Sequence, residues 1–523
     1  MKIVELFEHS RKTVAVFAIV ITLFLLILNV LYRAVMPMSD AEISQLFINN
    51  FSSYLLTVIS IITVILFINI TSTVNPSCLF VILSVLFLTC GLFLINHSPS
   101  ILRSDPEIVF AGAIYLKGGD YTFFKKGMLD LDLAGYFFRY PHQLGLLSFE
   151  SFFFNLFKSS TPKIFFYINL IMNLGSNFLL WRISNILYRD KKVENLTILL
   201  SFLFLPNLFY ILFVYGTNPG IFFGLLGTWF WLKFAKNNKL LNAVLAMIFL
   251  SSAYFVRNNV IILLLSLLLI STIYFFKHKN PRLIALSIIT IVFAKGASQA
   301  NINHYEQLTH SQLVGEPKIA WVAMGLRDDK SSKKIPGWYD SYVEKVYKDG
   351  NGDSNTIQQL SEVELKKNLR YMLNHPGYSL TYFKNKLIST WNDGMFQSLW
   401  SGPESKHKGQ IVKGKIMEGI YSQGDGFSRI YNFSHYILLL IYIGLFIGVI
   451  ISNVGKGAEN YQALSNVLIF YFVGGVLFHL FWETKSQYAY PYLVYVIPVA
   501  AHGLANLQNM LKKNTIRRYL IKL

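Results

Sequence analysis

Long apolar runs alternate with two extended polar stretches along this chain. The runs hold roughly 17–25 residues, enough for a helix to cross about 30 Å of hydrocarbon. A helix satisfies its own backbone hydrogen bonds, so such runs predict membrane-spanning helices. We predict about twelve spans, near residues 13–32, 54–72, 78–97, 164–186, 195–215, 219–235, 240–256, 259–276, 283–299, 434–452, 463–481 and 488–508. The pattern therefore predicts an all-α polytopic membrane protein.

Two polar inserts divide the predicted spans. They cover about residues 98–163 and 300–432, and the second is large enough for a small, mainly helical domain. The predicted parts are three N-terminal spans in 1–97, a first large loop in 98–163, a six-helix block in 164–299, the second insert in 300–432, and three C-terminal spans with a basic tail in 433–523.

Basic residues orient the predicted bundle. They gather at the N-terminus and near 182–192, 233–239, 277–282 and 512–518, which all fall on one face if the spans number twelve. Basic loops mark the cytoplasmic face, so both termini are predicted inside and both inserts outside. These loops account for the net charge of +19 without a nucleic-acid partner. The first run is longer than a signal peptide's apolar region and has no cleavage site, so we expect a retained helix.

Four cations are then predicted on the opposite, outer side. Arg139 lies in the first insert, while Arg257, Lys295 and Lys485 lie at or just beyond the outer ends of spans. A cation near hydrocarbon is costly unless it is paired, reaches water or meets an anion. For each of these cations taken alone, an ion pair or contact with water is a sufficient explanation. Four at one depth favour an anionic ligand such as a lipid-linked phosphate or pyrophosphate.

Acidic residues occur at the same predicted depth. Ser104 to Glu107 has the spacing of a helix capping box, which favours a capping role for Glu107. Asp105 can serve both as a cap and as a catalytic base. The stretch "MPMSDAEIS" offers the same pattern with Asp40 and Glu42. Spacing alone does not choose between Asp105 and Asp40.

Two further patterns carry less information. His479 and Glu483 are four residues apart and are expected on one helical face, but one such pair is not a metal site. The stretch "VYGTNPG" at 214–220 is typical of a tight turn whose Gly and Asn residues serve turn geometry. No P-loop, dinucleotide-binding glycine motif or nucleophile elbow is present in the sequence, which argues against ATP or NAD chemistry of the soluble type.

Several strings, taken in order, resemble the bacterial GT-C glycosyltransferases, multi-span enzymes similar in design to protein mannosyltransferases. The resemblance covers about residues 100–505 and depends on the strings "SDPEIVFAGAIYLKGGDY", "YFFRYPHQLG", "VYGTNPG", "YFVRNNVI", "WVAMGLRDDKSSKKIPGWYDSY" and "WETKSQYAYPYLVYVIPVAAHGL". Each string is weakly specific, whereas the ordered set is more so. The implied fold is a GT-C-like helical bundle.

The resemblance implies roles for particular residues. The acidic catalytic position of the family matches Asp105, with Glu107 beside it. Arg257 and Lys485 match the family's positions that hold the lipid phosphate. Lys295 joins the phosphate-binding group through the charge argument. The expected cleft-lining residues are Arg139, Tyr140, His142, Asn258, Gln487 and Tyr488. Thr217 and Asn218 stand where relatives often carry an acidic residue, so an acidic role for that turn is in doubt.

The predicted function is therefore an inverting glycosyl transfer at the outer face of a bacterial cell membrane. A polyprenyl-phosphate-linked sugar is the expected donor, and a cell-envelope glycan or teichoic acid the expected acceptor, with an Asp as general base. The sequence requires no cofactor and leaves a divalent cation open. The alternatives are a polymerase or ligase acting on lipid-linked polysaccharide, a lipid flippase or transporter, and a non-catalytic scaffold.

Overall fold

The computed structural model describes residues 2–39, 42–51, 54–55, 58–59, 62, 72–126, 135–403, 406–407, 410–454 and 464–507. Within these residues the chain is helical, apart from two short antiparallel strand pairs. The expected all-α architecture is therefore confirmed.

The elements follow one another in this order: α1 (Lys2–Leu31), β1 (Tyr32–Val35), β2 (Gln45–Ile48), α3 (Pro76–His97), α4 (Asp105–Lys117), η2 (Thr122–Phe124), α5 (Tyr136–Arg139), η3 (Pro141–Gln143), α6 (Leu144–Phe157), α7 (Pro162–Tyr188), α8 (Lys191–Leu203), α9 (Pro206–Phe209), η4 (Tyr210–Leu212), α10 (Thr217–Asn237), α11 (Leu240–Val256), η5 (Asn258–Val260), α12 (Ile261–His278), α13 (Arg282–Thr309), α14 (Lys318–Gly325), η6 (Lys330–Ser332), α15 (Tyr342–Asp349), α16 (Ser354–Asn374), α17 (Pro376–Trp391), β3 (Lys406–His407), β4 (Gln410–Ile411), α18 (Lys415–Tyr421), α19 (Asp425–Val454), α20 (Asn466–Phe481) and α21 (Ser486–Ala505).

Local sequence signals explain where several of these helices begin. Asn75 caps α3 by accepting a hydrogen bond from the backbone N–H of Ser77, and Pro76 occupies the first helical position. Asp190 caps α8 in the same way, 2.7 Å from the N–H of Lys192. Such caps satisfy backbone donors that have no partner inside the helix.

Five described helical segments are long and apolar enough to cross a membrane, namely 76–97, 162–188, 258–278, 282–309 and 425–453. A sixth is counted if 191–203 and 206–212, which meet at a bend of 53°, form one span. Pro206 lies at that bend, where its ring interrupts a continuous helix. Shorter apolar helices cover 15–31, 240–256 and 466–481. The span predicted at 54–72 lies largely outside the described residues, and a total of twelve stays a prediction.

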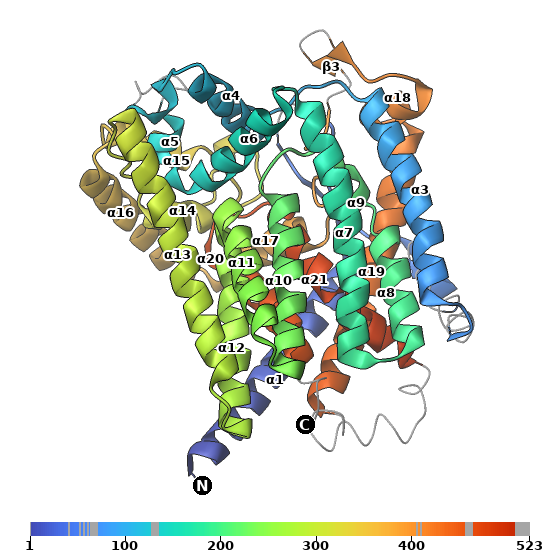
Figure 1. Cartoon of the computed structure of the whole chain (residues 1–523). Coiled ribbons are helices and arrows are strands. Elements are labelled where there is room, and N and C mark those ends of the chain that lie inside the picture. Colours follow the sequence, from blue (N-terminus) through green and yellow to red (C-terminus); the bar gives the residue numbers. More distant parts are fainter. Residues whose placement is uncertain are drawn as a thin grey trace.

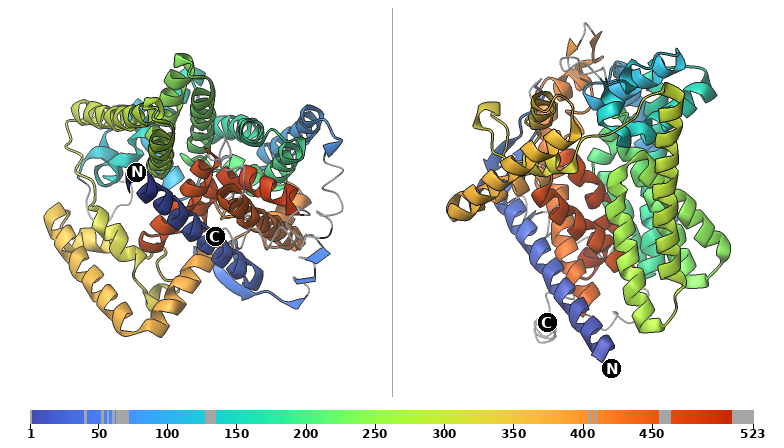
Figure 2. Two further views of the ribbon diagram at one scale, coloured as in Figure 1. Left: turned by 90° about the horizontal axis from the view of Figure 1, so that it is seen from below. Right: turned by 90° about the vertical axis from the view of Figure 1, so that its left-hand side faces the viewer.

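Both inserts lie at one end of the bundle, which we call the insert end, and the N-terminus lies at the opposite end (Figure 1). The central helices pack in neighbouring pairs, chiefly α10 with α11 and α19 with α21. Figure 2 shows α1 running beside the C-terminal helices, against which it packs through α19. Helices α14 to α16 enclose a small separate core that includes Met324, Val343 and Ile357.

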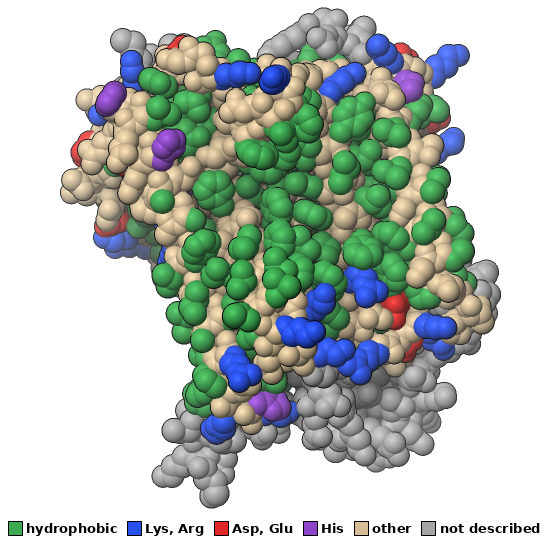
Figure 3. All heavy atoms as spheres, in the orientation of Figure 1, with side chains coloured by type: hydrophobic (Ala, Val, Ile, Leu, Met, Phe, Trp, Pro, Cys, Tyr) green, Lys and Arg blue, Asp and Glu red, His purple; other side chains and the backbone are tan. Residues whose placement is uncertain are grey.

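Apolar side chains cover the middle of the face seen in Figure 3, and Lys and Arg side chains gather toward its two ends. Exposed apolar residues on the helices include Val85 on α3, Ile171 on α7 and Val292 on α13. Exposed apolar area of this extent is suited to lipid contact and ill suited to water.

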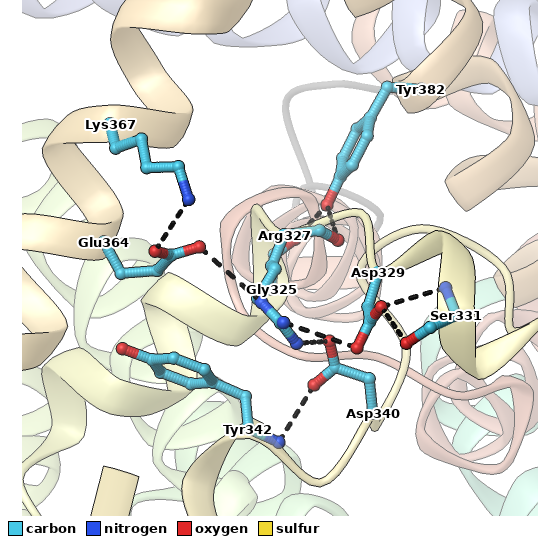
Figure 4. Close-up of polar contacts among 9 residues, drawn as sticks. All are labelled: Gly325, Arg327, Asp329, Ser331, Asp340, Tyr342, Glu364, Lys367 and Tyr382. Atoms are coloured by element: carbon cyan, nitrogen blue, oxygen red, sulfur yellow. Dashed lines mark hydrogen bonds and ion pairs between the residues drawn. The ribbon is translucent and has the colours of Figure 1, made fainter. Parts of the chain in front are cut away.

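An ion-pair network organises the loop between α14 and α15. Arg327 pairs with Asp340 and lies 3.3 Å from Asp329 and 3.6 Å from Glu364, while Glu364 also pairs with Lys367 at 3.3 Å (Figure 4). Because the guanidinium has several donors in one plane, a single arginine can hold three carboxylates, here two from the loop and one from α16. The network therefore fixes the loop that leads to Trp338 and Tyr339.

Candidate active site

Asp105 is the first residue of α4, at the insert end of the bundle. Ser104 takes the N-cap position, but its side chain makes no capping hydrogen bond, so the predicted capping box is wrong in this respect. The reason is conformational, because Ser104 has φ 60° and ψ −148° instead of the extended backbone of a capping serine. Glu107 lies half-buried in the first turn.

The backbone of Ser104 is strained. Its angles fall in a region that residues other than glycine rarely occupy, at a cost on the order of 1–3 kcal/mol. Its carbonyl still accepts a hydrogen bond from the N–H of Glu107 at 2.9 Å, which closes the first turn. This sharp change of direction places Asp105 at the exact point where the chain enters the helix, and strain of this kind is often found at functional sites.

The carboxyl of Asp105 lies among charges from several distant segments. Burial raises the pKa of Asp105 above its ordinary value, and Glu42 and Glu344 act in the same direction. Lys485 and Arg257 act in the opposite direction. Asp105 nevertheless remains accessible to solvent. We use the name Asp105 recess for Asp105 together with the charged residues that influence it, Glu42, Arg257, Glu344 and Lys485.

Lys485 reaches this recess as half of an ion pair. Its Nζ atom lies 2.7 Å from a carboxylate oxygen of Glu42. Glu42 also accepts a hydrogen bond from Gln397 at 3.0 Å and lies 4.0 Å from Lys334. Burial works against the ammonium charge, but Glu42 and Glu483 outweigh it and raise the pKa of Lys485. Part of the charge of Lys485 is therefore already neutralised by the protein.

Arg257 is placed differently, because no described carboxylate lies within ion-pair distance of it. It follows the end of α11, and its guanidinium carbon lies 4.8 Å from the ring centre of Tyr215 and 5.8 Å from that of Tyr488. Its charge also lowers the pKa of Asp105 and of His142, so it faces the same recess. Among the predicted cations within the described residues, Arg257 is thus the one best placed to meet an outside anion.

Two glycines allow Arg257 to lie so close to α10. A Cβ atom on Gly216 would lie 2.3 Å from the carbonyl oxygen of Val256, and one on Gly220 would lie 3.0 Å from Cβ of Arg257. The φ of Gly216 is −62°, and α10 begins at Thr217. Gly216 does lie in a turn before α10, as expected, but it is the close approach between helices that requires a glycine at both positions.

Arg139 and Tyr140 belong to a polar cluster beside the recess. Arg139 lies 2.7 Å from Glu316 and 3.7 Å from Glu344, and it donates a hydrogen bond to the hydroxyl of Tyr140 at 2.8 Å. Backbone hydrogen bonds tie the same segments together, including one of 3.1 Å from the N–H of Glu316 to the carbonyl of Arg139. The charge of Arg139 is therefore used to join the two inserts.

His142 remains accessible next to this cluster. Burial lowers the pKa of His142 to about 4, assisted by the positive charges of Arg257 and Lys318. It is consequently a neutral imidazole near pH 7 and can give or accept hydrogen bonds. As expected, Pro141 ends the short helix before it and opens a 3₁₀ turn.

The remaining predicted residues divide into two groups. Asn258 and Tyr488 adjoin Arg257, and Gln487 donates its backbone N–H to the side chain of Gln397 at 3.2 Å. Lys295, in contrast, is exposed on α13 beside the exposed Phe293, with no described contact to the recess. The sequence predicted a depth for Lys295 but could not predict the side of the helix on which it lies.

Glu483, which lies close to Lys485 in the chain, is not arranged as the sequence pattern predicted. Helix α20 ends at Phe481, before Glu483. The expectation that Glu483 shares a helical face with His479 is therefore wrong. Burial raises the pKa of Glu483 to about 7, although Lys485 opposes this. Within the described residues, no group of three or more His, Cys, Asp or Glu side chains is arranged to hold a metal ion. Asp40 lies outside the described residues.

Several recess residues did not follow from the sequence. The sequence could have indicated Glu42, because this residue belongs to the acidic motif after the first predicted span. No sequence feature distinguished Glu344 or Gln397, because each lies in a polar stretch with many similar residues. Tyr215, whose hydroxyl accepts a hydrogen bond from Gln143, was hidden in the apparent turn.

Fold and recess together define a membrane-embedded helical protein with a charged recess at the end that carries its two inserts. A scan against models of protein families finds no match, and a search among curated proteins finds none either. The resemblance to the GT-C glycosyltransferases therefore stays a prediction.

Proposed function

We propose that this protein is an integral-membrane glycosyltransferase that takes a sugar from a polyprenyl-phosphate donor and transfers it on the extracytoplasmic face of a bacterial membrane. One observation carries the proposal. Asp105 begins α4, and Arg257, which has no described carboxylate partner, is close enough to lower the pKa of Asp105 although the two residues lie far apart in the chain. A base and an anion-binding cation are the two groups that such a transfer needs.

In the proposed reaction, Asp105 accepts the proton of an acceptor hydroxyl while that oxygen attacks C1 of the sugar. The bond between C1 and the phosphate oxygen breaks, and its electron pair stays on the phosphate. Attack from the opposite side inverts the anomeric centre. Arg257 stabilises the phosphate as its negative charge grows, and this selective stabilisation of the transition state lowers the barrier.

The electrostatic setting of Asp105 supports its role as a base. A carboxylate with an ordinary pKa is a weak base at neutral pH, and a raised pKa brings it closer to the working pH. Burial and the carboxylates Glu42 and Glu344 raise the pKa of Asp105. His142, a neutral imidazole in the same recess, is available to orient the acceptor by hydrogen bonding.

The proposed donor fits the proposed location. A polyprenyl chain would lie against the apolar helices, with its phosphate at the insert end beside Arg257. Tyr140 and Tyr488 would contact the sugar, and a cell-envelope glycan or teichoic acid would enter from the outer side. The acceptor class depends on the family resemblance alone. No metal is needed for these steps, and a divalent cation beside the phosphate stays an open alternative.

The test is sugar transfer by the Asp105→Asn variant, measured as release of polyprenyl phosphate from a synthetic donor. We expect normal expression and a loss of turnover of about 10²–10⁴-fold, because the amide cannot accept the proton. Asp349→Asn, at an exposed position at the end of α15, is the matched control. Retained turnover in Asp105→Asn would rule out Asp105 as the base and direct the same test to Asp40.

The same assay separates the alternatives. Consumption of a pyrophosphate-linked donor in place of the monophosphate would indicate a polymerase or ligase. Movement of the donor across the bilayer without release of its phosphate would indicate a flippase or transporter.

A further inference from the structure

A cavity of about 340 Å³ has none of the charged residues around Asp105 in its lining. The hairpin of β1 and β2, the residues after α17 and the first turns of α19 form its walls. Its polar lining includes Arg33, Gln45, Gln423, Ser428, Asn432 and His435. Arg33 is the charged residue of this lining, and no carboxylate contributes to it.

Arg33 has unused hydrogen-bonding capacity. One terminal nitrogen donates to the side-chain oxygen of Asn432 at 2.9 Å, and the guanidinium carbon lies 5.6 Å from the ring centre of Phe47. Its Nε atom is buried without an acceptor, and no described carboxylate pairs with it. A buried donor without a protein partner can be satisfied by water, an ion or a ligand. A guanidinium is best matched by an oxyanion with two oxygens.

His435 adds a second unmatched nitrogen to the lining of the same cavity. It is buried, with 6% of its surface exposed, and its Nδ1 atom has no described partner. Its Nε2 atom lies 3.3 Å from the amide nitrogen of Asn49, which also donates to the carbonyls of Asn29 and Val30. Two residues about 400 positions apart thus bring nitrogen atoms without a described partner to the lining of one cavity.

Apolar groups border this donor-rich cavity. Phe47 and Phe427 belong to its lining, and Ile48, the residue after Phe47, is 75% exposed. Arg33 comes two residues after the end of α1, where an apolar helix meets polar chain. A single positive charge, several neutral donors and an apolar border suit a singly charged phosphate whose other substituents are partly apolar.

We propose that this cavity binds a phosphodiester group, held by Arg33 with Asn432 and His435. The site is separate from the Asp105 recess, although the same hairpin forms part of both. On the cavity side Ala34 donates its backbone N–H to the carbonyl of Asn392 at 3.1 Å. On the other side Glu42, just before β2, pairs with Lys485. The occupant is either a bilayer glycerophospholipid headgroup or a phosphodiester in a soluble polymer.

The test measures binding of two probes to the full-length protein: phosphatidylglycerol in mixed detergent micelles, and water-soluble glycerophosphoglycerol. Arg33→Gln removes the charge and keeps an amide of similar reach. We expect its affinity to fall about tenfold or more, because one charge-assisted contact is lost. Arg370→Gln, which removes an exposed arginine on α16, is the matched control and should bind normally.

A second variant protects the test against misfolding of the first. Ser428→Glu leaves Arg33 in place and adds a carboxylate to the cavity, so it should weaken binding by pairing with the arginine and repelling the anion. Loss with both variants supports the site, and binding of the lipid alone identifies a membrane headgroup as its source. Binding of both probes identifies the phosphodiester itself. Unchanged binding of both probes by folded Ser428→Glu would overturn the proposal, whatever the outcome for sugar transfer.

Discussion

Two cations of the Asp105 recess illustrate how equal charges take unequal roles. Lys485 lies 2.7 Å from Glu42, so much of its field is cancelled before a ligand arrives. Arg257 rests over the rings of Tyr215 and Tyr488, which stabilise a cation without neutralising it. An incoming phosphate therefore gains more from Arg257. The ion pair of Lys485 instead holds the segment before β2 against the start of α21.

The charge of Glu344 provides a test of the proposed base. Glu344 raises the pKa of Asp105, so Glu344→Gln should lower it. More Asp105 is then ionised at a given acidic pH, and the acidic limb of kcat/KM should move to lower pH. The measurement is a pH profile of sugar transfer. Glu362→Gln, which breaks an exposed pair with Lys366 on α16, is the control and should leave the profile in place. A shift toward higher pH would contradict the assignment.

At the scale of elements, contacts between helix ends position the recess. Lys386 of α17 is buried and donates hydrogen bonds to the carbonyls of Leu480 at 3.0 Å and Trp482 at 2.9 Å, and also to that of Gly325. Three carbonyls match the three N–H groups of an ammonium. The end of α20, the end of α14 and α17 are thereby joined. The short segment that carries Lys485 is held by this junction.

Close packing of α10 and α11 gives a second prediction. Gly216→Ala should force the start of α10 away from Val256, because the new Cβ would lie 2.3 Å from its carbonyl oxygen. Arg257 would move with it, so donor binding should weaken and stability fall by about 1–3 kcal/mol. Gly296→Ala on α13 is the control, since nothing lies within 4 Å of its added Cβ. Donor titration and thermal unfolding provide the readouts, and normal donor affinity in Gly216→Ala would count against this packing role.

At the scale of the whole molecule, the two inserts occupy one end and the N-terminus the other (Figure 1). The inserts are also joined to each other, through Arg139 and Glu316 at 2.7 Å. A bundle of this kind presents one polar, structured end to one side of the membrane. The side itself follows from the distribution of basic residues, which stays a prediction.

Labelling of introduced cysteines tests this orientation. With Cys78 and Cys90 replaced by serine, Lys125→Cys in the first insert should react with an impermeant maleimide in intact cells. Lys191→Cys, at the start of α8, should react only after the membrane is permeabilised. Both positions are exposed, so accessibility within the protein does not limit either reaction. Labelling of Lys191→Cys in intact cells would reverse the predicted orientation.

The sequence by itself determined the helical membrane class, because each apolar run must satisfy its own backbone hydrogen bonds in lipid. It also determined which charges are unusual, since Asp105, Arg257 and Lys485 interrupt or border those runs. Only the tertiary structure decided which of these charges meet, which is why Lys485 has Glu42 as partner and Lys295 has none in the described recess. The physical reason is that burial against lipid acts along a single helix, whereas ion pairs and close glycine contacts depend on how distant helices pack together.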